Sequence, residues 1–360
     1  MDIIKIDEEL SNRLANMSFV CACLVPSLHI ATTFNAGTVS WWLYVVCFKT
    51  GFAQIAVPMF FVISGFLLAG RMGEKSWWRS AVEKRIRSLV IPYVFWAFFY
   101  LIYPCCITSI CHYVGICFRG GAWNEIDLSV VANTLGIDFM RMPKMTHLWF
   151  LRSLFVFVLI SPLFMSCRQK WFGMFLIVGL MGVSLTQQMV SIPQFEPWFV
   201  TFMRIAWVKG LCYFISGIWL RWNGKLASEC IRRVPNVVFL AIGTGLFIVD
   251  NYCGLVGYQW YGACRTLGFP FAMIGIWRVV SYRRWPSWLT QSAFPMYLCH
   301  SAIITVFLGV SRTMVLSTET TSSLSFYLLE YVFTLLGCVG IAVCLRRMVP
   351  KFYRVVFGGR

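Results

Sequence analysis

The sequence predicts an all-α fold, a polytopic transmembrane helical bundle of about ten spans with both termini in the cytoplasm. Of its 360 residues, 59% are hydrophobic and only 12% are charged, and the mean hydropathy is +0.72. A soluble domain is closer to half apolar and a quarter charged. The apolar residues gather in runs of about 18 to 22, the length that crosses ~30 Å of hydrocarbon. Basic residues separate these runs.

Each apolar run predicts one membrane-spanning helix. We expect a single membrane domain over residues 1–360, with no soluble domain. The predicted spans, in chain order, are residues 16–34, 51–70, 88–106, 147–165, 171–190, 203–220, 235–251, 263–280, 289–310 and 325–345.

The connecting segments have distinct characters. Residues 36–50, AGTVSWWLYVVCFKT, predict a short helix on the outer surface. Residues 71–88 predict a basic cytoplasmic loop, in which Trp77 and Trp78 suit the level of the lipid headgroups. Residues 107–146 form the longest external loop, which either covers a site or simply connects two spans.

The positive charge is distributed as in a membrane protein. There are 31 lysines and arginines against 14 acidic residues, a net charge of +17. Basic residues that bind nucleic acid would gather on one soluble face. The lysines and arginines here lie between the apolar runs, so we expect no nucleic acid partner. Most of them fall on one side if both termini are cytoplasmic, as the positive-inside rule requires. We therefore expect membrane lipid to be a partner of the protein.

Ionisable side chains within the spans are costly, so each is a candidate functional residue. In this topology the histidines and arginines of the spans lie toward the outer side. A packed structural histidine, or an arginine that extends to the headgroups, is the alternative interpretation of each. The candidates are His29 and, for substrate binding or stabilisation of an oxyanion, His147, His300, Arg152, Arg204 and Arg265.

Carboxylates are nearly absent from the spans. Asp250 lies at the outer end of one span and Glu330 in the outer third of another. Proton-coupled or sodium-coupled transporters usually need such groups at the midplane. A neutral imidazole can instead take a proton from an attacking hydroxyl near pH 7. The 15 cysteines show no paired metal-ligand spacing, so we expect no metal.

Four segments resemble a known family. They occur in the expected order and cover essentially the whole chain. The chain is similar in them to acyltransferase family 3, integral membrane proteins that include bacterial O-antigen and Nod-factor O-acetyltransferases. The segments are VPMFFVISGFLLAGR (57–71), EKRIRSLVIPYVFW (83–96), HLWFLRSLFVFVLISPL (147–163) and SAFPMYLCHSAII (292–304).

The resemblance implies a function. Such proteins take an acyl group, usually acetyl, from cytoplasmic acyl-CoA and deliver it to a hydroxyl of a glycan or another acceptor, often across the membrane. His29 matches the first-span histidine of the family and would be the catalytic residue, as general base or as an acyl carrier. We therefore expect a multi-pass enzyme of the bacterial inner (cytoplasmic) membrane. Acetyl-CoA would be its donor substrate.

The resemblance also implies a binding site for the donor. The basic group after SGF suits the phosphates of CoA, although plain anchoring on the cytoplasmic side explains each cation equally well. Residues of the SGF segment would shape a tunnel for the pantetheine arm. The implied donor-binding residues are Arg71, Lys84, Arg85 and Arg87 for the phosphates, and Phe60, Phe61, Ser64 and Gly65 for the arm.

One position departs from the family pattern. The family usually carries Arg or Lys eleven residues before its first-span histidine, and this sequence has Ser18 there. Either Arg13 reaches up from five residues earlier, or binding of CoA is weakened.

Two alternative functions stay open beside the O-acyltransferase. One is a transporter or flippase of a lipid-linked glycan, and the other is a catalytically degenerate family member that holds a partner.

Overall fold

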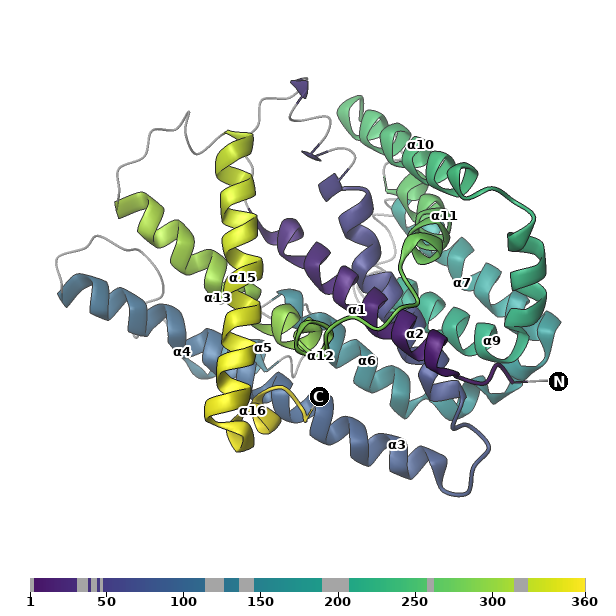
Figure 1. Ribbon diagram of the computed structural model, residues 1–360, viewed down its shortest axis with the longest axis horizontal. Helices are drawn as coiled ribbons and strands as arrows, with labels where there is room; N and C mark the ends of the chain where they lie inside the picture. Colours follow the sequence, from purple (N-terminus) through teal and green to yellow (C-terminus); the bar gives the residue numbers. More distant parts are fainter. Residues whose placement is uncertain are drawn as a thin grey trace.

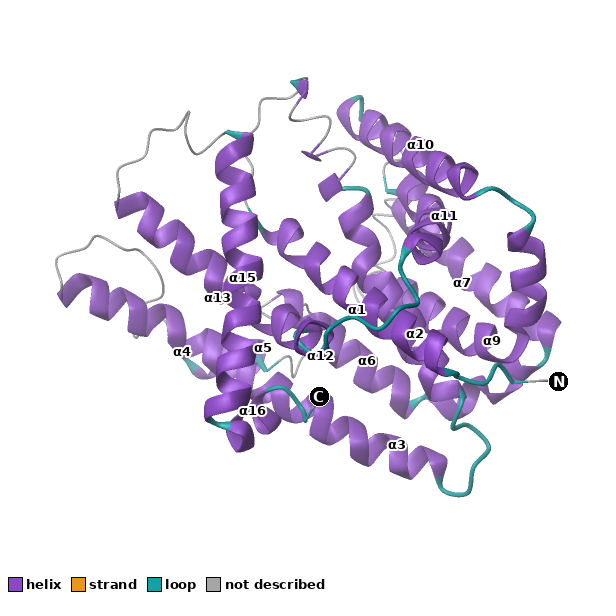
Figure 2. Cartoon of the chain, in the orientation of Figure 1, coloured by secondary structure: helices purple, strands orange, loops and turns teal. Residues whose placement is uncertain are grey.

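The computed structural model describes residues 3–30, 38–39, 44–45, 48–113, 126–135, 146–189, 207–257, 262–313 and 323–359. Over these residues the secondary structure is helical, and Figure 2 shows no strand among them. The all-α prediction is therefore confirmed. Helices satisfy their own backbone hydrogen bonds, which is the condition for crossing a lipid bilayer.

The ten predicted spans each overlap a helix or a pair of helices. The helices of the described residues are α1 (Glu8–His29), η2 (Phe52–Ile55), α2 (Ala56–Ala69), α3 (Trp77–Arg85), η3 (Ile86–Val90), α4 (Ile91–Tyr113), α5 (Leu128–Thr134), η5 (Thr146–Leu148), α6 (Trp149–Leu159), η6 (Ser161–Arg168), α7 (Lys170–Met189), α9 (Trp207–Arg232), α10 (Asn236–Leu255), α11 (Ala263–Val279), α12 (Ser287–Thr290), α13 (Ala293–Thr313), α15 (Leu324–Met348) and α16 (Pro350–Val356).

Several of these helices suit a bilayer by length and composition. Among the described residues, four continuous helices are long and apolar enough to span it, or five if α6 and η6, bent by 66°, count as one span. Two shorter apolar helices lie in α7 and α13. The count of ten spans and the cytoplasmic placement of the termini stay predictions.

The outward face of α15 is apolar. Leu328, Leu329 and Leu336 are exposed, whereas Tyr327 and Cys338 are buried. Exposed leucines on one side of a helix and buried residues on the other are typical of a helix between lipid and a protein core. This pattern agrees with a membrane protein.

The basic segment 71–88 forms a helix rather than the predicted loop. Only the turn before Trp77 is irregular, and Ser76 in it has a left-handed backbone with φ of 59°. The segment is rich in residues compatible with a helix, and Arg79 pairs with Glu83 one turn later at 3.0 Å. Helix α3 continues into α4 through η3, a π-helical turn. The segment was predicted as a loop because it lies between two spans, and most of this connection is helical.

The two segments predicted to lie on the outer side are described only in part. Of the predicted surface helix at 36–50, five residues before Thr50 are helical, and most of the others lie outside the described residues. Within the predicted loop at 107–146, helix α4 continues to Tyr113 and α5 covers Leu128–Thr134.

Helix α1 lies at the centre of the bundle (Figure 1). It packs against α2 and α13, while α2 in turn packs against α9. The pairs α10–α11 and α13–α15 lie on opposite sides of this centre (Figure 1). Helices α2 and α13, which are far apart in the sequence, thus pack on the same central helix.

Both ends of α1 are fixed. At its start the Asp7 carboxylate accepts a hydrogen bond of 2.8 Å from the backbone N–H of Leu10, an N-cap. Beyond its end, the Lys49 ammonium donates 2.8 Å to the backbone carbonyl of Ile30. Partial burial lowers the pKa of Lys49, and the nearby Glu330 carboxylate offsets this change in part. The contact with Lys49 thus fixes the backbone directly after the last turn, which carries His29.

Helices α2 and α9 approach so closely that glycine is required on both. A Cβ at Gly65 would lie 2.0 Å from the carbonyl oxygen of Phe214, and a Cβ at Gly217 would lie 2.0 Å from that of Val62. These contacts are with backbone, so a flexible side chain cannot move away. Small residues at helix interfaces allow such contact in membrane proteins.

We expect Gly217→Ala to destabilise the bundle by roughly 1–3 kcal/mol or more, because the added methyl group clashes with the α2 backbone. The measurement is thermal unfolding of the detergent-purified protein, together with its yield. Gly245→Ala in α10 is the matched control, since a Cβ there meets no atom within 4 Å. Equal unfolding temperatures for both variants would contradict this packing.

Candidate active site

Three histidines from separate elements form one cluster. His29 ends α1, His147 lies in η5, and His300 lies in α13. The ring centroid of His300 is 4.9 Å from that of His29 and 5.2 Å from that of His147. The centroids of His29 and His147 are 5.9 Å apart. Among the described residues, no group of three His, Cys, Asp or Glu side chains is arranged to hold a metal ion.

Hydrogen bonds orient the His300 ring, and contacts with two tyrosines hold His147 in place. Nδ1 of His300 lies 2.9 Å from the carbonyl oxygen of Tyr297 and 3.2 Å from that of Met296. Carbonyl oxygens only accept, so Nδ1 carries the hydrogen and Nε2 is the accepting nitrogen of the neutral ring. The hydroxyl of Tyr297 donates to the backbone carbonyl of His147. Tyr100 packs edge-on against the His147 ring at 4.9 Å.

A cavity of about 370 Å³ opens beside this cluster. We call it the histidine cavity. His29 and His147 line it, while His300 is fully buried behind them. Most of its other lining residues come from α2, α9 and α11, and two of them are cations, Lys209 and Arg265.

A buried ion pair fixes Arg265. Nε and Nη2 of Arg265 donate to Oδ2 of Asp250 at 2.9 and 2.6 Å. Oδ1 of Asp250 accepts from the backbone N–H groups of Gly262 and Arg265 at 2.6 and 3.0 Å. Asp250, noted in the sequence only as a carboxylate near a span end, is fully buried and joins α10 to the start of α11.

A larger cavity of about 1390 Å³ lies on the side of α1 that carries Ser18. We call it the basic cavity. All four cations expected to meet the donor phosphates, Arg71, Lys84, Arg85 and Arg87, line it. Glu83 is the single carboxylate among its described lining residues, and that group already pairs with Arg79. The fold therefore gathers a strongly positive lining.

Three further cations of this cavity were missed by the sequence analysis. They are Arg221 on α9 and Lys351 and Arg354 on α16. Arg221 is only 8% exposed, and its Nε and Nη1 atoms have no hydrogen-bond partner among the described residues. Its guanidinium lies 4.9 Å from the ring centroid of Phe66. In sequence these cations look like ordinary cytoplasmic anchors, and only tertiary packing brings them to the cavity.

The SGF segment divides between two roles. Ser64 and Phe60 line the basic cavity, and Phe61 lines the histidine cavity. Gly65 lines neither, because it faces the backbone of α9 at Phe214. The close backbone approach expected at this glycine is made by a neighbouring helix.

Arg13 is committed elsewhere and does not replace a cation at position 18. Its Nε and Nη2 donate to the carbonyl oxygens of Val280 and Arg278 at 3.1 and 3.2 Å. Its guanidinium also lies 5.0 Å from the ring centroid of Trp277. Ser18 does line the basic cavity, and its hydroxyl donates 2.8 Å to the carbonyl of Leu14.

Of the two remaining arginine candidates, the described one, Arg152, is not brought to the histidine cavity. Arg152 is buried on α6, where its guanidinium lies 6.0 Å from the ring centroid of Trp207, and it lines neither cavity. Arg204 lies outside the described residues.

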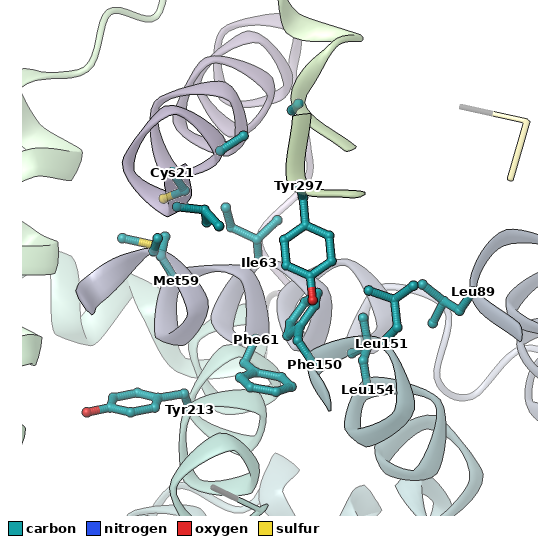
Figure 3. Close-up of a cluster of buried hydrophobic side chains, with 14 of the residues drawn as sticks. Cys21, Met59, Phe61, Ile63, Leu89, Phe150, Leu151, Leu154, Tyr213 and Tyr297 are labelled. Atoms are coloured by element: carbon teal, nitrogen blue, oxygen red, sulfur yellow. The ribbon is translucent and has the colours of Figure 1, made fainter. Parts of the chain in front are cut away.

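An aromatic wall separates the two cavities. Tyr297 lines both of them. Its ring centroid is 5.6 Å from that of Phe150, which is 4.7 Å from that of Phe61. Figure 3 shows the Tyr297 side chain pointing from α13 toward Phe150. The cavities therefore meet within one side-chain layer, next to the histidine cluster.

Comparison with known proteins identifies the family of the chain. The sequence profile of acyltransferase family 3, described as an acyltransferase domain, matches residues 16–345. The chain therefore belongs to this family of membrane acyltransferases. It is also similar to the inner membrane protein YcfT of Escherichia coli (strain K12), with 23% identity over 269 residues, which cover 66% of this chain and 65% of that protein. No solved structure matches the chain.

We expect Asp250→Asn to lower the free energy of unfolding by roughly 3 kcal/mol, because the largely buried Arg265 charge loses its partner. The experiment compares thermal unfolding of the purified variant with that of Glu229→Gln, which neutralises an exposed carboxylate on α9. An Asp250→Asn protein as stable as the control would show that the pair contributes little.

Proposed function

We propose that this protein is an integral membrane O-acyltransferase. It takes an acyl group, most commonly acetyl, from cytoplasmic acyl-CoA and transfers it to a hydroxyl of a cell-surface or secreted saccharide. The observation that carries the proposal is the position of His29, in a small cavity that meets a large cationic cavity at Tyr297. Such an arrangement suits two substrates that approach from opposite sides.

The basic cavity suits the CoA part of the donor. Guanidinium groups bind phosphate through paired hydrogen bonds, and this lining provides several of them. The donors of Arg221 that lack partners are available to a phosphate oxygen. The apolar part of the lining, with Phe60 and Phe150, suits the pantetheine arm, whose thioester would then reach the aromatic wall at Tyr297.

His29 would act as the general base. It takes the proton of the acceptor hydroxyl while the oxygen attacks the thioester carbonyl carbon. A C–O bond forms, the C–S bond breaks, and the CoA thiolate takes the proton from the imidazolium. The products are the O-acyl acceptor and free CoA. Transfer through an acyl-histidine is the other route consistent with this site.

His147 and His300 would assist this step. Nε2 of His147 has no hydrogen-bond partner among the described residues, and the residue lines the same cavity as His29. It is therefore available to hydrogen-bond the developing oxyanion, for which Arg265 is the other candidate. His300 packs against both rings and would hold their orientation.

The proposed setting is the inner (cytoplasmic) membrane of a bacterium. Its support is the family, the apolar helices and the name of the E. coli relative. With the termini in the cytoplasm, the basic cavity opens to cytoplasmic acyl-CoA and the histidine cavity lies toward the outer side. The enzyme would then acylate an acceptor on the far side of the membrane.

The transporter or flippase alternative draws on the cations of the histidine cavity, which also suit a lipid-linked pyrophosphate. It gives no role to the histidine cluster or to the second, basic cavity. The degenerate alternative draws on Ser18, but Arg221 offers a cation in the same cavity. The proposed enzyme accounts for both cavities.

Replacement of His29 by alanine should reduce acetyl transfer by about 10²–10⁴-fold, because the hydroxyl loses its general base. The measurement uses purified protein with labelled acetyl-CoA and a panel of surface-glycan extracts, with mass spectrometry of the acetylated product. His112→Ala is the control, since His112 is exposed at the end of α4. Full transfer by the His29→Ala protein would refute the mechanism.

Arg221→Gln should raise KM for acetyl-CoA by about tenfold while kcat changes little, because a phosphate loses a charged hydrogen-bond donor. In that background, Ser18→Arg should restore part of the loss, since position 18 lines the same cavity. Arg232→Gln at the exposed end of α9 is the control. An unchanged KM in Arg221→Gln would remove Arg221 from the donor site.

A further inference from the structure

The histidine cavity carries more positive charge than its described lining residues neutralise. Lys209 and Arg265 line it, and no Asp or Glu is among its described lining residues. Asp250, the nearby carboxylate, is engaged through both oxygens with Arg265 and the adjoining backbone. That pair is neutral as a unit, so the charge of Lys209 remains.

Lys209 faces the interior of the bundle rather than lipid. It lines the histidine cavity together with Tyr213, which lies one turn further along the same face of α9. The Lys209 ammonium lies 4.9 Å from the ring centroid of Phe269 on α11, and it forms no hydrogen bond with the described residues. A lysine that served as a lipid anchor would extend to the headgroups instead.

The N–H groups of an ammonium in this position can donate hydrogen bonds to a ligand. A charge taken out of water is costly unless it is paired and hydrogen-bonded. The cation–π contact with Phe269 compensates only a part of this cost, typically about 0.5–2 kcal/mol. The remaining compensation can come from an anion in the cavity, because the three ammonium hydrogens are strong donors to oxygen.

We infer that the histidine cavity binds its acceptor through an oxyanion, a carboxylate or a phosphate on the saccharide, with Lys209 as the residue that determines this specificity. Arg265, held by Asp250, is the second cation of the subsite. This inference rests on the proposed function, since it names the class of acceptor for the same site. The cavity volume of about 370 Å³ falls at the low end for small-molecule sites, so it suits a single sugar unit.

The anion site also explains how the hydroxyl would be positioned. Lys209 and Arg265 line the same small cavity as His29, so an acceptor anchored by its charge keeps its ring beside the imidazole. Fixing a reactant in this way lowers the entropic part of the barrier. A neutral sugar of the same shape would lack the anchor.

The binding test uses the purified full-length protein in detergent, with no acyl donor present. Its unfolding temperature is measured with methyl glucoside, methyl glucuronide and the 6-phosphate of methyl glucoside, which share one ring and differ in charge. We expect stabilisation by the glucuronide, the phosphate or both, and none by the neutral glycoside. The comparison of the two anions distinguishes a uronate acceptor from a phosphorylated one.

Variants at position 209 assign the effect to this lysine. Lys209→Met should weaken binding of the anionic probe by about tenfold or more, because a charged hydrogen bond is lost. Lys209→Arg should keep the preference for the anion. Lys225→Met, on the same helix but outside the cavity, should bind like the wild type.

Three results would overturn the inference: no stabilisation by either anion, equal stabilisation by the neutral glycoside, or unchanged anion binding in a folded Lys209→Met protein.

A parallel assay with labelled acetyl-CoA and the same three sugars separates this inference from the proposed function. Selective binding of an anion that depends on Lys209, without acetyl transfer to any sugar, would support the subsite and count against the proposed acyltransferase.

Discussion

The backbone contact between α2 and α9 is the constraint on which both cavities depend. Gly65 and Gly217 let the two helices touch without intervening side chains. Because α2 carries Phe61 and Ser64, and α9 carries Lys209 and Arg221, this one contact sets the walls of both cavities. A bulkier residue at either glycine would separate the helices and change both linings at once.

Two helices also connect the cavities along their length. On α1, Ser18 and His29 are eleven residues apart, about 16 Å at the helical rise, and each lines a different cavity. On α9, Lys209 and Arg221 are spaced by about 18 Å and divide in the same way. Under the proposed function, donor phosphates and acceptor would thus be held by opposite ends of the same rigid elements, with the aromatic wall between them.

Much of the fold followed from sequence, because a bilayer requires long apolar helices. The predicted spans all overlap helices, and charge marked their ends. The structure of the segments between the spans was harder to predict. The basic segment that begins at Arg71 was expected to be a loop, and it contains helix α3. The three histidines of the candidate site were named from the sequence, and their roles stay predictions. Arg221 and Lys209 were missed, because a cation near a span end looks the same in sequence whether it faces a cavity or anchors the helix.

The sequence by itself determined the class of protein, the position of His29 and the cationic segment after SGF, since apolar length and residue order carry that information. Only the tertiary structure decided which polar groups share a cavity. It brings together three histidines that are far apart in the chain, commits Arg13 to backbone carbonyls, and engages Asp250 with Arg265. The physical reason is that the sequence of a helix gives the height of a residue along the helix axis and the helix face on which it lies. Which residues of other helices it meets depends on how the helices pack.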